Sequence, residues 1–294
     1  MSTSSATAAV AAGTGTGSTG STGTSTGTST TTSTTTSTGP RAPGSRPADD
    51  AALRLTGVTH AFTPGAAPVL DGVDLTVRPG EFVCLLGASG CGKSTLLQLV
   101  AGLETPTAGR VEVPAGRPSL MFQDSALLPW LTASANVELA LRARKVPRAE
   151  RRTRAAELLE RVNLGGQGAK RVHELSGGMR QRVALARALA QDSPVLLMDE
   201  PFAALDAITR DVLHEELTRV WAEQRLAVVF VTHNVREAVR LGQRVLLMSS
   251  RPGRIIREWA VDLPQPRRIE SPGVAQLAVE ITEHLRGEIS RHGR

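Results

Sequence analysis

The segment GASGCGKS, from Gly87 to Ser94, matches the phosphate-binding pattern G-x-x-x-x-G-K-[ST] at every fixed position. Glycines let the backbone wrap closely, so that successive N–H groups point at phosphate oxygens, and a following helix adds the positive end of its dipole. Lys93 can place its charge against β- and γ-phosphates, and the Ser94 hydroxyl can ligate Mg²⁺. The pattern predicts a nucleotide-phosphate site formed by Gly87, Ala88, Ser89, Gly90, Cys91, Gly92, Lys93, Ser94 and Thr95.

A pair of acids follows an apolar run further along the chain, in VLLMDEP. In a parallel sheet, the carboxyl end of this strand lies at the same edge as the phosphate loop. Asp199 is the candidate Mg²⁺ partner, through a water molecule, and Glu200 is the candidate to orient or deprotonate an attacking water. The alternative is a solvated pair at a strand end, which the four apolar residues ahead and the phosphate loop upstream disfavour.

A second glycine-bearing turn occurs in LSGGMRQR, from Leu175 to Arg182, and it has no lysine. Ser176 and the N–H groups of Gly177 and Gly178 open a predicted helix, which makes an anion-binding end. Ser176 also fits the role of helix N-cap. The residues alone do not say whose phosphates this turn would bind.

The elements around these motifs alternate between strands and helices. Two half-buried strands are predicted at 53–58 and 69–77, and continuous apolar runs predict buried strands at 81–87, 193–201, 226–233 and 243–250. Helical patterns begin at Lys93 and cover 154–162, 178–190 and the stretch from about 271. Buried strands alternating with helices indicate a parallel α/β sheet, into which the helical middle is inserted as a subdomain.

Composition divides the chain further. Residues 1–48 are almost entirely Thr, Ser, Gly and Ala, and we expect this tail to be disordered. The expected nucleotide-binding domain covers 51–268, with a helical subdomain at about 124–190, and a C-terminal helix covers 269–294.

The net charge, the cysteine count and the length of the apolar runs exclude several classes of protein. The net charge of +6 permits an acidic partner, but Arg is spread along the chain and no basic stripe carries interleaved aromatics, so we expect no nucleic-acid partner. Two cysteines, Cys84 and Cys91, are too close for a disulfide framework, which fits a reducing compartment. No apolar run is long enough to span a membrane and no signal peptide is predicted, so a membrane role would come through a partner.

Taken together, the ordered motifs resemble those of the ATP-binding subunit of an ABC transporter. The resemblance covers Leu53 to about Arg268, and it rests on GASGCGKST, FQD, LSGGMRQR, VLLMDEP, ALD and VTH in this order. It implies a P-loop NTPase core of the ABC type: a mostly parallel sheet, an antiparallel β subdomain and an inserted α-helical subdomain. It also implies ATP and Mg²⁺ as cofactors.

The resemblance assigns roles to individual residues. It implies that the LSGG turn faces the phosphate loop of a second ATP-binding subunit, so that ATP bridges two chains. Gln123 matches the glutamine that contacts Mg²⁺ or the attacking water, and His233 matches the switch histidine near the γ-phosphate. Asp206 matches an aspartate that helps to form the dimer. Phe62 falls where an aromatic ring stacks on adenine, with His60 as a competitor.

With these roles, the implied catalytic residues are Glu200, His233 and Gln123, and the implied metal site comprises Ser94, Gln123 and Asp199. Asn234, Gly242 and Gln243 depart from the usual family pattern, and we expect them to alter a helix end or a surface bond only.

The resemblance also suggests partners. The apolar loop around Leu127, Leu128 and Trp130 lies where a membrane permease docks in the family, although local packing explains the two leucines equally well. The motif variants look most like those of importers of nitrate, sulfonates and taurine. This implies a homodimer of ATP-binding subunits on the cytoplasmic face of the membrane, with a permease as partner and, indirectly, a solute-binding protein. An exporter or lipid-transport ATPase is the alternative, followed by a non-transport ABC ATPase.

Overall fold

The computed structural model describes residues 51–114 and 116–292. Residues 1–48, for which disorder is predicted, lie outside this range, and so do the last two residues of the predicted C-terminal helix.

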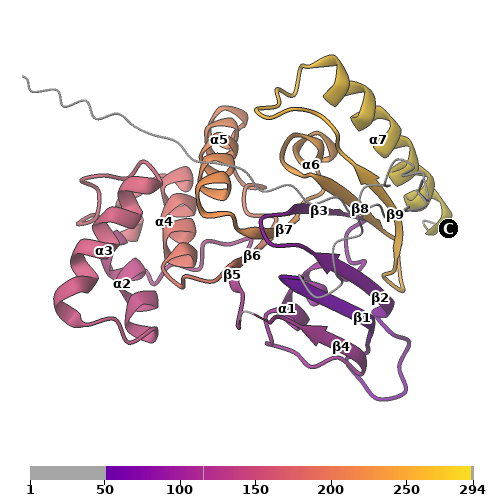
Figure 1. The fold of residues 1–294 in the computed structure, drawn as a ribbon, viewed down its shortest axis with the longest axis horizontal. Helices are drawn as coiled ribbons and strands as arrows, with labels where there is room; N and C mark the ends of the chain where they lie inside the picture. Colours follow the sequence, from indigo (N-terminus) through magenta and orange to yellow (C-terminus); the bar gives the residue numbers. More distant parts are fainter. Residues whose placement is uncertain (1–50, 115, 293–294) are drawn as a thin grey trace, which may run out of the picture. The chain divides into compact units, whose positions relative to one another are not determined.

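The central sheet has six strands in the order β5-β6-β7-β3-β8-β9 (Figure 1). The first five run parallel, and β9 joins the edge antiparallel to β8. The bounds are Phe82–Leu86 for β3, Ser119–Met121 for β5, Val195–Asp199 for β6, Ala227–Val231 for β7, Arg244–Met248 for β8 and Ile255–Ala260 for β9.

Both faces of this sheet are covered, which explains why the central strands β3 and β7 are apolar along their whole length. In β3, Phe82, Cys84 and Leu86 pack into one hydrophobic cluster, whereas Val83 and Leu85 point into another. The first cluster contains α2 to α7, and the second contains α1 and a separate antiparallel sheet. Figure 1 shows α5, α6 and α7 on one side of the central strands and α1 on the other.

The separate sheet has the order β2-β1-β4, with β1 at Leu53–His60, β2 at Leu70–Val77 and β4 at Ala108–Glu112. Both pairings are antiparallel. Alternation places Leu53 and Leu55 in the core while Arg54 lies between them, as a half-buried strand requires. The predicted fold class is therefore confirmed, including its antiparallel β subdomain.

Helices cover the remaining surfaces. The bounds are Lys93–Val100 for α1, Ala133–Ala143 for α2, Arg148–Arg161 for α3, Gly177–Leu189 for α4, Ala207–Gln224 for α5, Val235–Leu241 for α6 and Pro272–His292 for α7. A short 3₁₀ turn, η1, covers Val172–Glu174. Helices α2, α3 and α4 pack on one another through Val137, Leu159 and Val183, and they form the helical region between β5 and β6.

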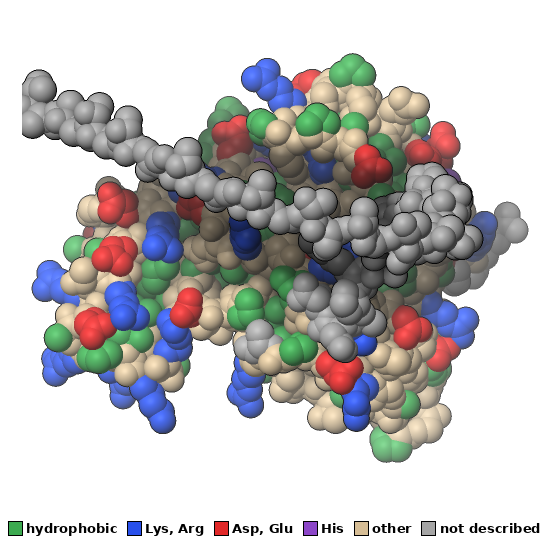
Figure 2. Space-filling model, in the orientation of Figure 1, with side chains coloured by type: hydrophobic (Ala, Val, Ile, Leu, Met, Phe, Trp, Pro, Cys, Tyr) green, Lys and Arg blue, Asp and Glu red, His purple; other side chains and the backbone are tan. Residues whose placement is uncertain are grey.

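The arginine-rich stretch between Ala143 and Arg154 is exposed on this helical region. Acidic side chains are interspersed among its cations (Figure 2), and Arg144 pairs with Asp192 while Arg154 pairs with Glu150. None of the helices in the described part of the chain combines the length and apolarity needed to cross a bilayer.

Candidate active site

Four loops meet at the carboxyl edge of the central sheet. Leu85 of β3 pairs with Val231 of β7, and Val231 pairs with Asp199 of β6. The phosphate loop follows β3, the acidic pair ends β6, and His233 follows β7. Gln123 comes two residues after β5, which pairs with β6. The sheet register therefore gathers the predicted catalytic residues on one edge, as expected of a parallel α/β sheet.

The phosphate loop is closed around Lys93. Its Nζ donates hydrogen bonds to the carbonyl oxygens of Gly87 and Ala88, each at 2.9 Å, and the side chain is buried. Gly92 ends the loop with φ +102°, and a Cβ there would lie 2.7 Å from Leu70 Cδ2. Only glycine combines this backbone conformation with such a close approach. The loop thus holds a buried positive charge at the start of α1, where the helix dipole also favours an anion.

Asp199 and Ser94 provide adjacent oxygen donors beside this charge. The Ser94 hydroxyl donates a hydrogen bond to the Asp199 carboxylate. Burial raises the pKa of Asp199 above its usual value, although the bond from Ser94 opposes this shift. A hydroxyl and a carboxylate fit Mg²⁺, which uses one or two protein oxygens together with phosphate oxygens and waters.

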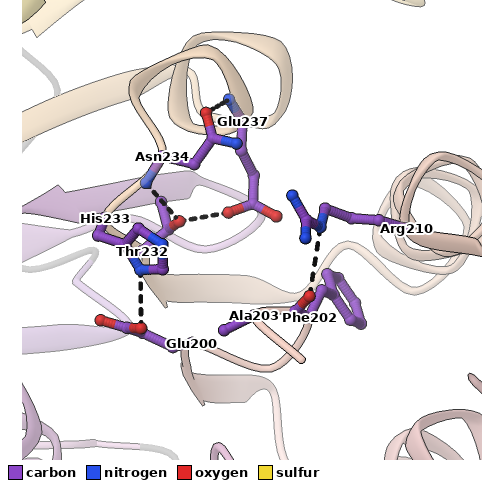
Figure 3. A pocket seen from close by; sticks show the side chains of 8 residues that line it. All are labelled: Glu200, Phe202, Ala203, Arg210, Thr232, His233, Asn234 and Glu237. Carbon is purple, nitrogen blue, oxygen red and sulfur yellow. Dashed lines mark hydrogen bonds and ion pairs between the residues drawn. The ribbon is translucent and has the colours of Figure 1, made fainter. Parts of the chain in front are cut away.

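Glu200 and His233 are in contact. Nδ1 of His233 lies 2.8 Å from Oε2 of Glu200 (Figure 3), and the Glu200 amide donates to the carbonyl of Val231 at 3.0 Å. Glu200 has φ +42°, a left-handed conformation that costs a residue with a side chain on the order of 1 kcal/mol. This strained turn directs its carboxylate toward His233 and away from the strand.

Side chains of α4 hold the loop that carries Gln123. Gln181 donates to the carbonyl of Gln123 at 3.1 Å. Arg187 donates to the carbonyls of Ser125 and Ala126, both at 2.7 Å, and burial lowers the pKa of its guanidinium. The sequence analysis assigned no role to Gln181 or Arg187, because nothing in the sequence distinguishes them from the other polar residues of this helix, Arg180 and Arg182.

The LSGG turn begins α4. The Ser176 Oγ accepts from the Met179 amide at 3.3 Å, which makes it the N-cap that the sequence predicts. A Cβ on Gly178 would lie 2.4 Å from Thr209 Cγ2, so glycine allows α4 to approach the start of α5. Asp206 caps α5 by accepting from the Thr209 amide at 3.0 Å. LSGG and Asp206 therefore belong to one packed unit.

This unit is separate from the phosphate loop of the same chain. Within residues 51–114 and 116–292, no hydrogen bond or ion pair joins Ser176, Gly177 or Gly178 to residues 87–95. Helices α1 and α4 also lie apart in Figure 1. Ser176, Gly177, Gly178 and Asp206 thus lie together, apart from the phosphate loop, and Phe62 lies between β1 and β2.

Two more arginines support the loops, and the sequence analysis assigned no role to either. Arg210 donates to the carbonyl of Leu205 at 2.7 Å and to that of Phe202 at 3.3 Å, which fixes the segment before Asp206. Arg251 donates from Nε to the carbonyl of Gly90 in the phosphate loop at 3.3 Å. The Arg210 contacts are local in the sequence, whereas the Arg251 contact joins residues 161 positions apart.

The structure distinguishes the two aromatic candidates for adenine stacking. Phe62 is 62% exposed, whereas His60 is 5% exposed and places Nδ1 3.1 Å from the carbonyl of Thr105. The rings of His60 and Phe62 meet edge to face with centroids 5.0 Å apart. His60 is therefore a buried support, and Phe62 is the ring with a face free for a base.

We expect Phe62→Ala to raise the Kd for ATP about tenfold, because one base–aromatic stack contributes about 1–3 kcal/mol. Phe62→Trp keeps a stacking face and should bind ATP nearly as well as the wild type. Titration with a fluorescent ATP analogue measures both. An unchanged Kd for Phe62→Ala would mean that adenine binds elsewhere.

The fold and this edge of loops define a P-loop nucleotide hydrolase: a phosphate loop, an acidic strand end and a histidine on adjacent parallel strands. Residues 70–203 match the family described as ABC transporter. The chain is 49% identical over 214 residues to the taurine import ATP-binding protein TauB of Chromobacterium violaceum, covering 70% of this chain and 82% of that protein. It is 43% identical to the aliphatic sulfonates import ATP-binding protein SsuB 1 of Agrobacterium fabrum, covering 84% of this chain and 89% of the relative.

A solved structure is also similar. The dimeric, post-hydrolysis state of the ATP-binding cassette MJ0796 with ADP and Pi is 33% identical, with a TM-score of 0.62, and the match covers 72% of this chain and all of that one. The chain belongs to the family of ABC transporter ATP-binding proteins. It is an ATPase of this type.

Proposed function

We propose that this protein is the ATP-hydrolysing subunit of an importer for taurine or another aliphatic sulfonate. The observation that carries this proposal is the identity of 43–49% to ATP-binding proteins of taurine and sulfonate import. It works as a dimer on the cytoplasmic face of the membrane, where it drives a separate permease that receives its substrate from a solute-binding protein.

In the proposed mechanism, ATP lies between two subunits. Lys93 and the loop N–H groups hold the β- and γ-phosphates, Phe62 stacks on the adenine, and Ser176, Gly177 and Gly178 of the second subunit approach the γ-phosphate from the other side. Ser94, Asp199 and Gln123 are the residues that would hold Mg²⁺, which supplies positive charge against the phosphates. Glu200 orients and deprotonates the attacking water, and His233 contacts the γ-phosphate.

An exposed apolar loop supports the permease partner. Leu127 is buried in the core of the helical region, so local packing explains it, but Trp130 is 67% exposed and Phe122 is 43% exposed. The side chain of Asn136 braces the loop, because it accepts from the Leu128 amide at 2.8 Å and donates to the Leu128 carbonyl at 3.3 Å. A rigid loop that presents a tryptophan to solvent suits docking to another protein.

Affinity capture of the tagged protein from detergent-solubilised membranes of its host tests the proposal, with partners identified by mass spectrometry. We expect a polytopic permease to be captured, and we expect taurine or alkanesulfonate uptake to be lost when the gene is deleted. Trp130→Asp should lose the permease, whereas the control Ile256→Asp, at an exposed position on β9, should retain it. Capture of a permease with unchanged uptake would favour export, and capture of ribosomal or DNA-bound proteins would refute transport.

A further inference from the structure

A single hydroxyl fixes the backbone on both sides of His233. Thr232 is 2% exposed, and its Oγ accepts a hydrogen bond from the Asn234 amide at 3.0 Å. The same hydroxyl donates its proton to Oε2 of Glu237 (Figure 3). The Thr232 amide donates to the Leu85 carbonyl of β3 at 3.2 Å. The segment that carries His233 is thereby attached to the strand that leads into the phosphate loop.

Glu237 is the next group in this chain of hydrogen bonds. It lies in the first turn of α6 and is 5% exposed. While Oε2 accepts from Thr232, Oε1 lies 2.6 Å from Nε2 of His214. The Asn234 side chain accepts from the Glu237 amide at 3.3 Å, so this helix turn is anchored to the same short segment.

His214 supplies the third group, from α5. It is 1% exposed, and its ring packs against Phe202 with centroids 5.5 Å apart. Its Nδ1 faces Nη1 of Arg240 at 3.5 Å, and that same Nη1 pairs with Asp211 at 2.6 Å. Nδ1 also lies 3.9 Å from Oδ1 of Asp211. A carboxylate only accepts, so Nε2 is the donor in the hydrogen bond to Glu237. The polar side-chain groups of Thr232, Glu237 and His214 therefore each have a hydrogen-bond partner.

The His233 side chain itself is not fixed by packing. It is 65% exposed, and it borders a small cavity whose other walls include Phe202, Ala203 and Arg210 (Figure 3). Its orientation depends on the backbone beneath it and on its contact with Glu200. Burying a carboxylate costs free energy, and apolar side chains would fill the same space without that cost. The buried groups instead direct their hydrogen bonds to the residues that flank His233.

We propose that His214 and Glu237 are positioning residues for hydrolysis: through Thr232 they hold the backbone of His233 where its ring meets Glu200. This inference rests on the proposed role of His233 at the γ-phosphate. His214 lies on the helix that Asp206 caps, so the chain of hydrogen bonds also joins that helix to the switch histidine. Thr232, Glu237 and His214 are all buried, so we expect them to act through the backbone of His233.

Two matched pairs of variants test the inference in the purified full-length protein with ATP and Mg²⁺. Thr232→Val keeps the shape of the side chain but removes the hydroxyl, and we expect kcat to fall about tenfold with an unchanged KM for ATP, since small displacements of catalytic groups cost one to two orders of magnitude. Thr232→Ser keeps the hydroxyl and should retain most activity. His214→Leu should resemble Thr232→Val, whereas His214→Gln, which keeps a donor, should restore turnover. Thermal melting confirms that each variant is folded at the assay temperature.

The deciding measurement repeats Thr232→Val and His214→Leu in a His233→Ala background. If Thr232 and His214 act through His233, the two substitutions should lower kcat by less than about twofold in the His233→Ala background, because the effects of coupled residues are not additive. An equal loss with and without His233 would overturn the inference and mean that the network only stabilises the fold. If His233→Ala alone leaves turnover unchanged, the proposed role of His233 fails, and the positioning role fails with it.

Discussion

Glu200→Gln is expected to lower ATP turnover by at least about 100-fold while leaving ATP binding intact. Glutamine has the same shape but cannot accept the proton of an attacking water, and a general base contributes about 10²–10⁴-fold. Because the amide still fills the space beside His233, the phosphate loop should be unaffected. Since ATP that is bound and not hydrolysed should hold two chains together, we also expect an ATP-dependent dimer on gel filtration.

The measurements are phosphate release under saturating ATP and the Kd of a fluorescent ATP analogue. Glu223→Gln on the exposed side of α5 is a matched control, because in the described part of the chain its carboxylate pairs with Arg219 at the surface. Turnover close to that of the wild type in Glu200→Gln would show that another group activates water. Loss of nucleotide binding would instead mean that Glu200 supports the phosphate loop.

Ser176→Arg gives the second large effect: hydrolysis should fall by at least about 100-fold, whereas binding of ATP to the isolated chain should stay close to normal. The arginine blocks the N-terminal end of α4, which in the proposed dimer approaches the nucleotide of the other subunit. Among the described residues, Ser176 has no hydrogen bond to residues 87–95 of its own chain, so we expect single-chain binding to be independent of it.

The substitution also removes a helix cap, which is worth about 1 kcal/mol. Ser176→Ala removes the cap without adding bulk and separates this effect, and Thr153→Arg adds the same side chain at an exposed position of α3. Loss of ATP binding in Ser176→Arg would place the LSGG turn in its own chain's site. Normal hydrolysis would remove the turn from the site altogether.

The buried strands and the phosphate loop could be predicted because their signals are local. A continuous apolar run followed by glycines and lysine is readable without tertiary structure. The sequence analysis predicts no strand at β4 or β9 and no helix at α5, because their patterns are weaker. Strand β4 contains Gly109, whose close approach to Gly57 keeps a side chain out, and β9 turns most of its residues to solvent. Helix α5 buries His214 and Glu216 alongside its leucines, which obscures its apolar face.

Three departures from the family pattern have local explanations. Asn234 caps α6, which is the helix-end effect that we expected. A Cβ on Gly242 would lie 2.8 Å from the Arg244 carbonyl and 2.9 Å from Cys84 Sγ, so alanine does not fit there without a shift. Gln243 does more than alter a surface bond, because its Oε1 accepts from the Phe82 amide at 3.1 Å and fixes the start of β3. Such pairings join residues about 160 positions apart, and one sequence gives no signal for them.

The separation between the phosphate loop and the LSGG turn has a genetic consequence. If each ATP is held by the loop of one chain and the turn of the other, Lys93→Ala and Ser176→Arg damage opposite sides of the same site. A mixed dimer of the two variants has one site with both defects and one site with neither. Two alleles that are inactive alone should therefore complement each other when expressed together, whereas two different phosphate-loop alleles should not.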